Sequence, residues 1–375
     1  MRNQKVKILY IVSTLKQSGP TNQLLGLVEN INKAKFDISV LTLSPEPFNS
    51  KKNEFLSEGI KVDSLELTRV EFIIKGKRRL KNYIKKYNPD IIHSSGIRAD
   101  IAITKIKSNI QHCMTVHNYA FDDFISKYGY IIGKLAAESY IKAMQNCNYV
   151  ICCSKTLKQM YQKKLNQKLY YVQNGINTEK FKFPKNIDTK LSLRSKLNLP
   201  YSKKVILVVG SLIKRKDPLT IIRAFKQSNV GGRALLVLIG DGNLLEQCTK
   251  EADEHILVKG NVNNVRDYLH ASDIYISASK SEGLPNSVLE AGSSGLNVIL
   301  SNIPQHREIF EAEGRELFFY KFEVGNVEAL SSIIKEKVEE RSVNINYKLA
   351  NYIYKNFSNK NMSKKYEKLY LNMIK

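Results

Sequence analysis

The feature that most constrains the fold of this chain is an alternation of short, continuously apolar runs with segments of helical periodicity. The apolar runs lie at residues 6–14, 36–43, 60–67, 90–94, 112–117, 149–154, 170–173, 204–211, 234–240, 256–260, 273–279, 297–301 and 316–321. Helical periodicity marks residues 23–31, 75–87, 98–106, 129–146, 156–165, 219–227, 244–254, 265–271, 287–294 and 327–341. Strands covered by helices on both faces read as continuous Val, Ile and Leu runs. The sequence therefore predicts an α/β fold with doubly wound parallel sheets.

The alternation restarts near residue 203, after a polar stretch at residues 186–202. A chain of 375 residues is long for one core and sufficient for two, since domains commonly have ~100–200 residues. We expect one domain over residues 1–180 and a second over residues 200–356. Ligands of such sheets bind at the carboxyl ends of the strands, so we expect the site in a cleft between the two domains.

The chain is strongly basic, with a formal net charge of +24. Residues 1–180 carry 29 Lys and Arg against 14 Asp and Glu. This charge suits phosphorylated substrates, an anionic membrane face or a polyanion, although a Lys-, Asn- and Ile-rich genome produces the same bias. Residues 75–87 are either a solvated helix lying on the sheet or a basic surface resting on anionic lipid. No nucleic-acid reading module is present, so we expect no nucleic-acid partner.

The five cysteines are odd in number and lack metal-ligand spacing, which indicates reduced core residues in a reducing compartment. No run approaches the ~18 apolar residues of a membrane span. The apolar start at residues 6–14 is too short for a signal peptide and lacks a cleavage site. Asp122 and Asp123 look like loop carboxylates, and we expect no metal site. The sequence thus favours a cytoplasmic protein, with peripheral attachment at the inner face of the plasma membrane as an option.

One short segment carries the clearest chemistry, with Glu282 and Glu290 on either side of a helix start at Pro285 and Asn286. The N–H groups of a helix start can receive a diphosphate. Each flanking carboxylate could accept hydrogen bonds from a vicinal diol, one on a sugar and one on a ribose. This arrangement suits a nucleotide sugar, and a capping turn with two solvated glutamates is the alternative.

Motifs in a fixed order along nearly the whole chain match a known family. They are residues 17–23 (QSGPTNQ), 115–118 (TVHN), 172–176 (VQNGI), 209–211 (VGS), 214–216 (KRK), 239–242 (IGDG), 259–262 (KGNV), 271–273 (ASD) and 279–292 (SKSEGLPNSVLEAG). In this respect the chain resembles the family-4 retaining glycosyltransferases of bacterial surface polysaccharide biosynthesis. The resemblance implies the GT-B fold of two Rossmann-like domains, with the last segment, residues 357–375, crossing back onto the first domain.

The resemblance implies that the second domain binds the nucleotide sugar. Glu290 would accept hydrogen bonds from the ribose hydroxyls, and Glu282 would contact the hexose. Arg215 and Lys216 would bind the diphosphate. The implied donor-binding set also contains Gly210, Ser211, Gly260, Val262, Gly283, Leu284, Asn286, Ser287 and Val288. Many relatives carry arginine where this chain has Ser211, so more of the phosphate contact would come from Arg215 and Lys216.

The first domain would bind the acceptor, and His117 would act near the reacting carbon. The alternative for His117 is a structural role, in which the side chain only forms a hydrogen bond with the next loop. For His93 we favour a packing role. A glycine turn between strand and helix would contact the acceptor through Gly19, Pro20, Thr21 and Asn22. It lacks the dinucleotide-binding glycine pattern, so NAD binding is not expected.

The expected function is retaining transfer of a hexose or N-acetylhexosamine from a nucleotide diphosphate sugar. UDP is favoured as the nucleotide, and no metal or cofactor is expected. The acceptor would be a saccharide or lipid-linked saccharide in capsule, O-antigen or other surface glycan assembly. The alternatives are a nucleotide-sugar epimerase of the same fold and a non-catalytic basic binding protein.

Overall fold

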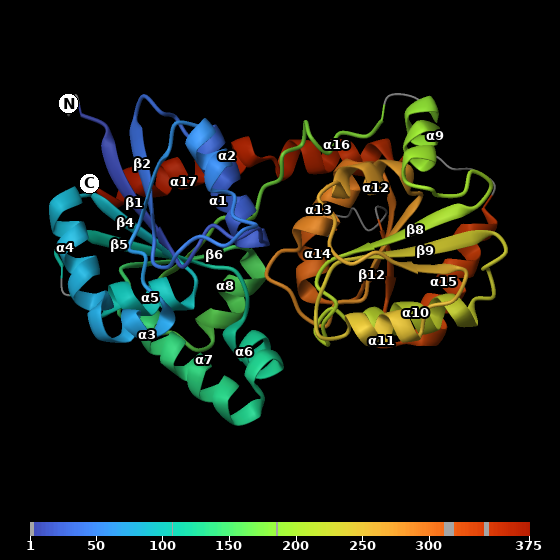
Figure 1. The fold of residues 1–375 in the computed structure, drawn as a ribbon, viewed down its shortest axis with the longest axis horizontal. Helices are drawn as coiled ribbons and strands as arrows, with labels where there is room; N and C mark the ends of the chain where they lie inside the picture. The colour runs from blue at the N-terminus through green and yellow to red at the C-terminus, as the bar shows by residue number, and fades with distance from the viewer. Residues whose placement is uncertain (1–3, 107, 185–186, 311–318, 341–344) are drawn as a thin grey trace. The chain divides into compact units, whose positions relative to one another are not determined.

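The computed structural model describes residues 4–106, 108–184, 187–310, 319–340 and 345–375. The chain forms two compact units (Figure 1). The first consists of Met1–Gly175 together with Asn359–Lys375, and the second is Ile176–Ser358. Each unit contains one parallel sheet with helices on its faces, so the expected α/β class is confirmed.

The sheet of the first unit has seven strands in the order β3-β2-β1-β4-β5-β6-β7. Its strands are β1 (Val6–Val12), β2 (Phe36–Thr42), β3 (Lys61–Ser64), β4 (Ile91–Ser95), β5 (Gln111–Val116), β6 (Tyr149–Cys152) and β7 (Leu169–Tyr171). All neighbours pair in parallel, and β1 lies between β2 and β4. The strand order therefore reverses next to β1, which makes the carboxyl ends of β1 and β4 the topological switch point.

Successive residues of β1 enter two different cores. Ile8 and Tyr10 pack with α1 (Gly19–Asn30) and α17 (Asn359–Met373), whereas Leu9 and Ile11 pack with α4 (Lys77–Tyr87) and α5 (Ile97–Thr104). Side chains alternate across a strand, so a strand with two covered faces needs apolar residues at every position. The remaining helices of this unit are α2 (Lys52–Ser57), α3 (Arg69–Glu71), the π-helix η1 (Phe72–Gly76), α6 (Ala120–Tyr128), α7 (Tyr130–Gln145) and α8 (Lys155–Gln162).

The C-terminal helix α17 belongs to the first unit, as the resemblance implied. Tyr366, Tyr370 and Met373 are buried in the same core as β1. A Cβ on Gly26 of α1 would lie 2.5 Å from Asn359, so the absence of a side chain at this position lets α17 approach α1 closely. Tyr370 OH also lies 2.7 Å from Nδ1 of buried His93, which agrees with the packing role expected for that histidine.

The sheet of the second unit has six strands in the order β10-β9-β8-β11-β12-β13. They are β8 (Lys204–Val209), β9 (Ala234–Ile239), β10 (Ile256–Val258), β11 (Ile274–Ser277), β12 (Asn297–Ser301) and β13 (Phe319–Phe322). The helices are α9 (Ile187–Lys196), α10 (Pro218–Gln227), α11 (Leu245–Lys250), α12 (Val265–Ala271), α13 (Asn286–Ser293), α14 (Pro304–Phe310), α15 (Val327–Glu339) and α16 (Tyr347–Asn356). Here β8 lies between β9 and β11, so the switch point is at the carboxyl ends of β8 and β11.

The polar stretch at residues 186–202 was expected between the two domains, and its described residues, 187–202, belong to the second unit. It contains α9, whose Arg194 is buried and pairs with Asp273 at 2.6 Å. The same guanidinium donates to the carbonyl oxygens of Ala271, Pro200, Tyr201 and Lys203. Ala271 and Asp273 are 77 and 79 residues away in sequence, so the polarity of the stretch alone could not show that it packs against the second unit. Parts of two expected elements, residues 316–318 and 341, lie outside the described residues.

Candidate active site

The loops that follow β8 and β11 meet at the switch point of the second unit. The loop after β8 carries Arg215 and Lys216, and the loop after β11 carries Glu282. The backbone N–H of Lys280 donates to the carbonyl oxygen of Arg215 at 2.8 Å, which ties the two loops together. Sequence motifs separated by more than sixty residues are thus brought to one place by the parallel topology.

Glu282 is the centre of this group, with 5% of its surface exposed. Its Oε2 atom lies 3.2 Å from Nη1 of Arg215, and its Oε1 atom accepts from Lys216 and, at 2.6 Å, from Ser279 Oγ. Burial opposes ionisation, but Lys216 and Arg215 outweigh it and lower the pKa of Glu282 to about 2. The carboxylate is therefore charged at neutral pH and holds both basic side chains inward.

A second layer of polar groups lies behind Glu282. Buried His306 of α14 has Nδ1 2.8 Å from the carbonyl oxygen of Ser301, so Nδ1 carries the proton. Burial lowers the pKa of His306 to about 4, which keeps the ring neutral with Nε2 as an acceptor. Ser277 Oγ lies 3.4 Å from Nε2 and 3.2 Å from Ser279 Oγ. No motif in the sequence marks this layer, so it was not expected.

The first turn of α13 comes directly after the loop that carries Glu282. The helix begins at Asn286 with Pro285 as its N-cap, and Glu290 lies one turn further along, half-buried. Tyr275 OH of β11 donates to Ser287 Oγ at 2.8 Å and fixes this turn to the sheet. Gly283, Leu284 and Val288 are buried, while Asn286 and Ser287 are half-buried. The two glutamates therefore stand on either side of a helix start, as the sequence predicts.

The remaining donor-site candidates lie at the ends of β8, β9 and β10. The N–H of Gly210 donates to Ile239 O, and the N–H of Gly240 donates to Gly260 O, each at 2.9 Å. A Cβ on Gly240, where φ is +145°, would lie 1.8 Å from Gly210 O, so only glycine fits there. Ser211 is exposed, and Gly260 and Val262 are half-buried.

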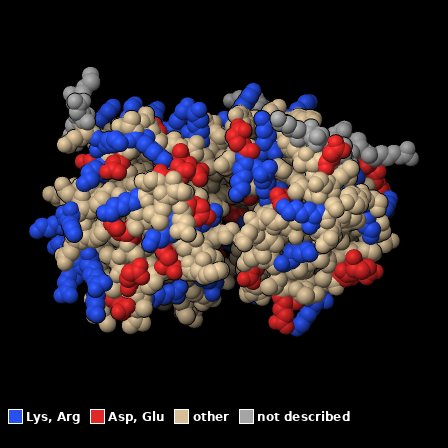
Figure 2. Space-filling view, turned by 45° about the horizontal axis from the view of Figure 1, so that its top comes forward, with Lys and Arg blue, Asp and Glu red and all other residues tan. Residues whose placement is uncertain are grey.

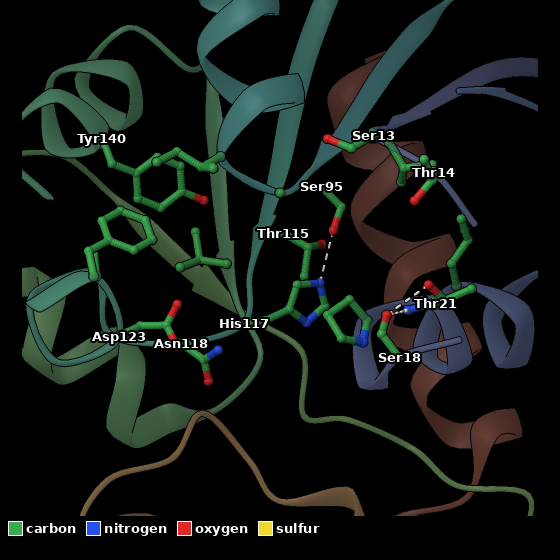
Figure 3. Close-up of a pocket in the computed structure, with 18 of the residues that line it drawn as sticks. Ser13, Thr14, Ser18, Thr21, Ser95, Thr115, His117, Asn118, Asp123 and Tyr140 are labelled. Carbon is green, nitrogen blue, oxygen red and sulfur yellow. Dashed lines mark hydrogen bonds between the residues drawn. The ribbon is translucent and has the colours of Figure 1, made fainter. Parts of the chain in front are cut away.

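The first unit has a pocket of about 270 Å³ at its own switch point (Figure 3). The residues that follow β1, β4 and β5 line it, together with the start of α1 and parts of α6 and α7. The lining residues include Ser13, Thr14, Ser18, Pro20, Thr21, Ser95, Gly96, Thr115, His117, Asn118, Asp123, Phe124, Lys127, Tyr128 and Tyr140.

His117 lies at the centre of this pocket, with Nε2 3.0 Å from Ser95 Oγ of β4 (Figure 3). Burial lowers the pKa of His117 to about 4, so the ring is neutral at physiological pH. The serine was missed because it lies one residue beyond the predicted strand end. Ser95 could have been predicted as a site residue, because polar side chains at the carboxyl ends of neighbouring parallel strands often lie together at a binding site.

The expected glycine turn before α1 is instead the first turn of that helix, which begins at Gly19. Ser18 is the N-cap, and its Oγ accepts from the backbone N–H of Thr21 at 3.3 Å. Of the four predicted acceptor-contacting residues, Pro20 and Thr21 line the pocket, whereas Gly19 and Asn22 do not.

The wall formed by α6 and α7 was not expected. Asp122 and Asp123, predicted in a loop, lie in the first turn of α6, and Asp123 reaches the pocket. Tyr140 of α7 lines the pocket and donates to buried Asp100 at 2.6 Å. Burial raises the pKa of Asp100 to about 7, against the lowering effect of its hydrogen bonds.

Two kinds of feature are absent from the part of the chain that the structure describes. No three His, Cys, Asp or Glu side chains are grouped so as to hold a metal ion there. Across the same residues, every helix is too short or too polar to cross a membrane.

Two family models match the chain. Residues 18–180 match glycosyltransferase family 4, and residues 189–358 match the glycosyl transferases group 1. The chain belongs to glycosyltransferase family 4. This family 4 enzyme is a glycosyltransferase of the GT-B fold, and family membership implies that the transferred sugar retains its anomeric configuration.

Individual relatives of this glycosyltransferase match over nearly its whole length. The O-antigen biosynthesis glycosyltransferase WclY of Escherichia coli is 25% identical over 99% of both chains. A UDP-Gal:α-D-GlcNAc-diphosphoundecaprenol α-1,3-galactosyltransferase of the same species is 25% identical over 99% of this chain and 98% of its own. Among solved structures, Anabaena HepE in complex with UDP-glucose matches with a TM-score of 0.83 at 14% identity, covering 98% of this chain and 99% of HepE.

Proposed function

We propose that this glycosyltransferase moves a hexose or N-acetylhexosamine from a nucleotide diphosphate sugar, with UDP as the favoured nucleotide. The acceptor is a hydroxyl of a saccharide or lipid-linked saccharide during assembly of a surface glycan such as capsule or O-antigen. The observation that carries the proposal is the pairing of Arg215 and Lys216 with Glu282 beside the first turn of α13. Two cations and a helix start gathered at a switch point suit a diphosphate.

In the second unit, Arg215 and Lys216 contact the diphosphate of the donor. As the bond between the anomeric carbon and the phosphate oxygen breaks, negative charge grows on the β-phosphate. Fixed cations there stabilise the transition state, so the proposed reaction needs no metal ion or cofactor. Backbone N–H groups from Leu284 to Val288 complete the contact, with Pro285 contributing only the shape of the turn.

The two glutamates have separate tasks. Glu290 accepts hydrogen bonds from the ribose hydroxyls, and backbone near Gly260 and Val262 faces the base. An ionised carboxylate has about four acceptor positions, and Ser279, Lys216 and Arg215 occupy three of those on Glu282. The remaining position, on Oε2, is available for a hydroxyl of the donor hexose.

The choice of UDP and of the acceptor class is supported by the relatives. The galactosyltransferase relative is named for a UDP-sugar donor and a diphosphoundecaprenol-linked acceptor, and HepE binds UDP-glucose. The pocket around His117 is the proposed acceptor site, since it lies at the switch point of the first unit. The acceptor oxygen attacks the anomeric carbon on the face that the diphosphate leaves, and its proton passes to the departing phosphate oxygen.

Peripheral attachment to the cytoplasmic face of a membrane is supported by α4. Leu80 and Ile84 pack into the core of the first unit, so the apolar side of α4 is occupied. Its exposed residues are Lys77, Arg78, Arg79, Lys81, Asn82, Lys85 and Lys86. Figure 2 shows basic side chains crowded at the left edge of this unit, the side on which Figure 1 places α4. In this proposal, α4 attracts anionic lipid by charge alone, at ~1 kcal/mol per basic residue.

The test is product analysis by mass spectrometry. The full chain is incubated with each common nucleotide diphosphate sugar, with and without membranes that carry lipid-linked saccharides. The proposal predicts sugar added to the lipid fraction and release of the nucleoside diphosphate. An altered sugar nucleotide produced without acceptor would contradict it, because that is the product of an epimerase.

A further inference from the structure

The end of α6 and the first turns of α7 expose large apolar side chains to solvent. Tyr130, Ile131, Ile132 and Leu135 have 68%, 74%, 64% and 62% of their surface exposed, and Tyr128 has 46%. We call these five residues the apolar tip. Solvent-facing helix positions are normally polar, and a contiguous apolar set of this kind marks an interaction site.

The packing of α6 on α7 explains why these side chains point outward. A Cβ on Gly133 would lie 2.5 Å from Ile125 Cα, so the two helices touch through backbone at this point. Gly133 and Ala137 are buried on the inner side of α7, and the larger side chains of its first turns take the outer side. The apolar residues of the tip therefore do not contribute to the core.

The apolar tip continues from the wall of the pocket. Lys127 and Tyr128 line the pocket, and Tyr130 is only two residues further along the chain. Lys127 Nζ lies 5.1 Å from the centroid of the Tyr128 ring, so a basic group of the pocket wall lies beside the tip. An acceptor whose saccharide occupies the pocket would have its anionic linkage and lipid near these residues.

A second exposed apolar group lies nearby, on the same unit. Val70, Ile73 and Ile74 of α3 and η1 have 67%, 83% and 75% of their surface exposed. Arg98 of α5 stacks on Phe72 of η1 at 5.0 Å, and α5 also packs against α7. The two apolar groups thus flank α5, and Figure 1 shows α3, α5, α6 and α7 together in the lower part of this unit.

The charge around the apolar tip identifies its partner. From Phe124 to Ala137 the chain contains two lysines, Lys127 and Lys134, and no Asp or Glu, while Asp123 and Glu138 lie immediately outside this range. Both lysines are exposed. Aromatic and aliphatic residues flanked by lysines are typical of segments that enter an anionic membrane surface. Two copies of this basic unit would repel each other, which disfavours self-association through the same face.

We propose that the apolar tip inserts into the surface of an anionic bilayer, so that the acceptor pocket opens beside the lipid that carries the acceptor. The link to the acceptor rests on the proposed function, whereas insertion itself does not. The basic helix α4 and the lysines at the tip attract the membrane, and the tip supplies the apolar contact that α4 lacks. The partner is the bilayer surface itself.

The chain contains no tryptophan, which permits a site-specific test of insertion. Ile131→Trp places a single fluorophore in the tip, and Leu56→Trp places one on α2, at a position that is 48% exposed. With vesicles of phosphatidylethanolamine and phosphatidylglycerol, emission from Ile131→Trp should shift to shorter wavelength and be quenched by brominated lipid. Emission from Leu56→Trp should not change. Equal responses from the two variants, or no response from either, would overturn the proposal.

A second measurement uses co-sedimentation of the full chain with the same vesicles, without donor or acceptor. Ile131→Ser combined with Ile132→Ser should weaken vesicle affinity by about tenfold or more, while Leu56→Ser leaves it unchanged. Wild-type affinity in the double variant contradicts insertion. A blue shift that grows with protein concentration in the absence of vesicles would instead assign the tip to a second copy. Because no sugar transfer is measured, failure here is separable from failure of the proposed reaction.

Discussion

The ammonium group of Lys216, in the loop after β8, forms an ion pair with the buried carboxylate of Glu282, in the loop after β11. Arg215 pairs with the second oxygen of the same carboxylate at 3.2 Å. One acidic side chain therefore positions two basic side chains at the switch point of the second unit. In the proposed reaction, the two cations act together on the diphosphate of the donor.

Removing either cation should slow the reaction strongly. We predict that Lys216→Ala and Arg215→Ala each lower the turnover number by at least ~10²-fold, because charge on the departing diphosphate loses a fixed partner. Exposed Lys214→Ala, next in sequence, is the matched control and should leave turnover unchanged. Sugar transfer measured at saturating donor checks this. Wild-type turnover in both basic variants would remove the diphosphate clamp from the account.

Glu290 should affect donor binding more than turnover. Glu290→Ala removes the acceptor proposed for the ribose hydroxyls, and hydrogen bonds to charged groups contribute ~1.5–3 kcal/mol. The expected result is a KM for the donor at least about tenfold higher with turnover at saturation largely retained. Glu246→Ala, at an 82% exposed glutamate of α11, is the control. A lower turnover number with unchanged KM would assign Glu290 to the chemical step instead.

Glu282 should contribute stability that depends on pH in a defined direction. Its pKa is lowered from 4.5 to about 2 in the folded protein by Lys216 and Arg215, despite burial. Its contribution is therefore complete above about pH 4.5 and is lost as pH falls toward about 2. Glu282→Gln should lower the free energy of unfolding at neutral pH by ~1–3 kcal/mol, less than for a fully buried pair because the cations retain some exposure. Urea unfolding of both proteins should show this difference shrinking as the pH falls below about 4.5. A constant difference would contradict the ion pair.

His117 should act as a neutral group. Burial lowers its pKa to about 4, and Ser95 is its hydrogen-bond partner at 3.0 Å. His117→Ala should lower turnover by a factor that stays constant between about pH 6 and pH 8, since the imidazole does not titrate there. Comparing the pH dependence of the turnover number between the wild type and the variant checks this. A loss of activity that changes with pH across this range would mean that the charged ring is the active form.

The sequence predicts the parallel sheets well because every strand position must be apolar when both faces are covered, as Ile8 and Leu9 show. It predicts the proximity of Glu282 to Arg215 and Lys216 only through the family motifs, since the pairing depends on strand order. It misses α9, whose Arg194 pairs with the distant Asp273, and α6, whose Asp123 reaches the pocket around His117. Helix α9 has little apolar periodicity, and α6 carries two aspartates in its first turn, which are also typical of a loop. The polar layer of His306 and Ser277 could not be predicted from a sequence pattern, because tertiary packing brings these side chains together.

Isothermal titration with UDP and GDP can show whether the loops after β8 and β11 bind a nucleotide diphosphate. We expect the wild type and Lys214→Ala to bind UDP in preference to GDP. The Arg215→Ala and Lys216→Ala double variant should bind UDP about 10²-fold more weakly, having lost two charged contacts. Absence of binding to both nucleotides, or wild-type affinity in the double variant, would contradict the proposed diphosphate site.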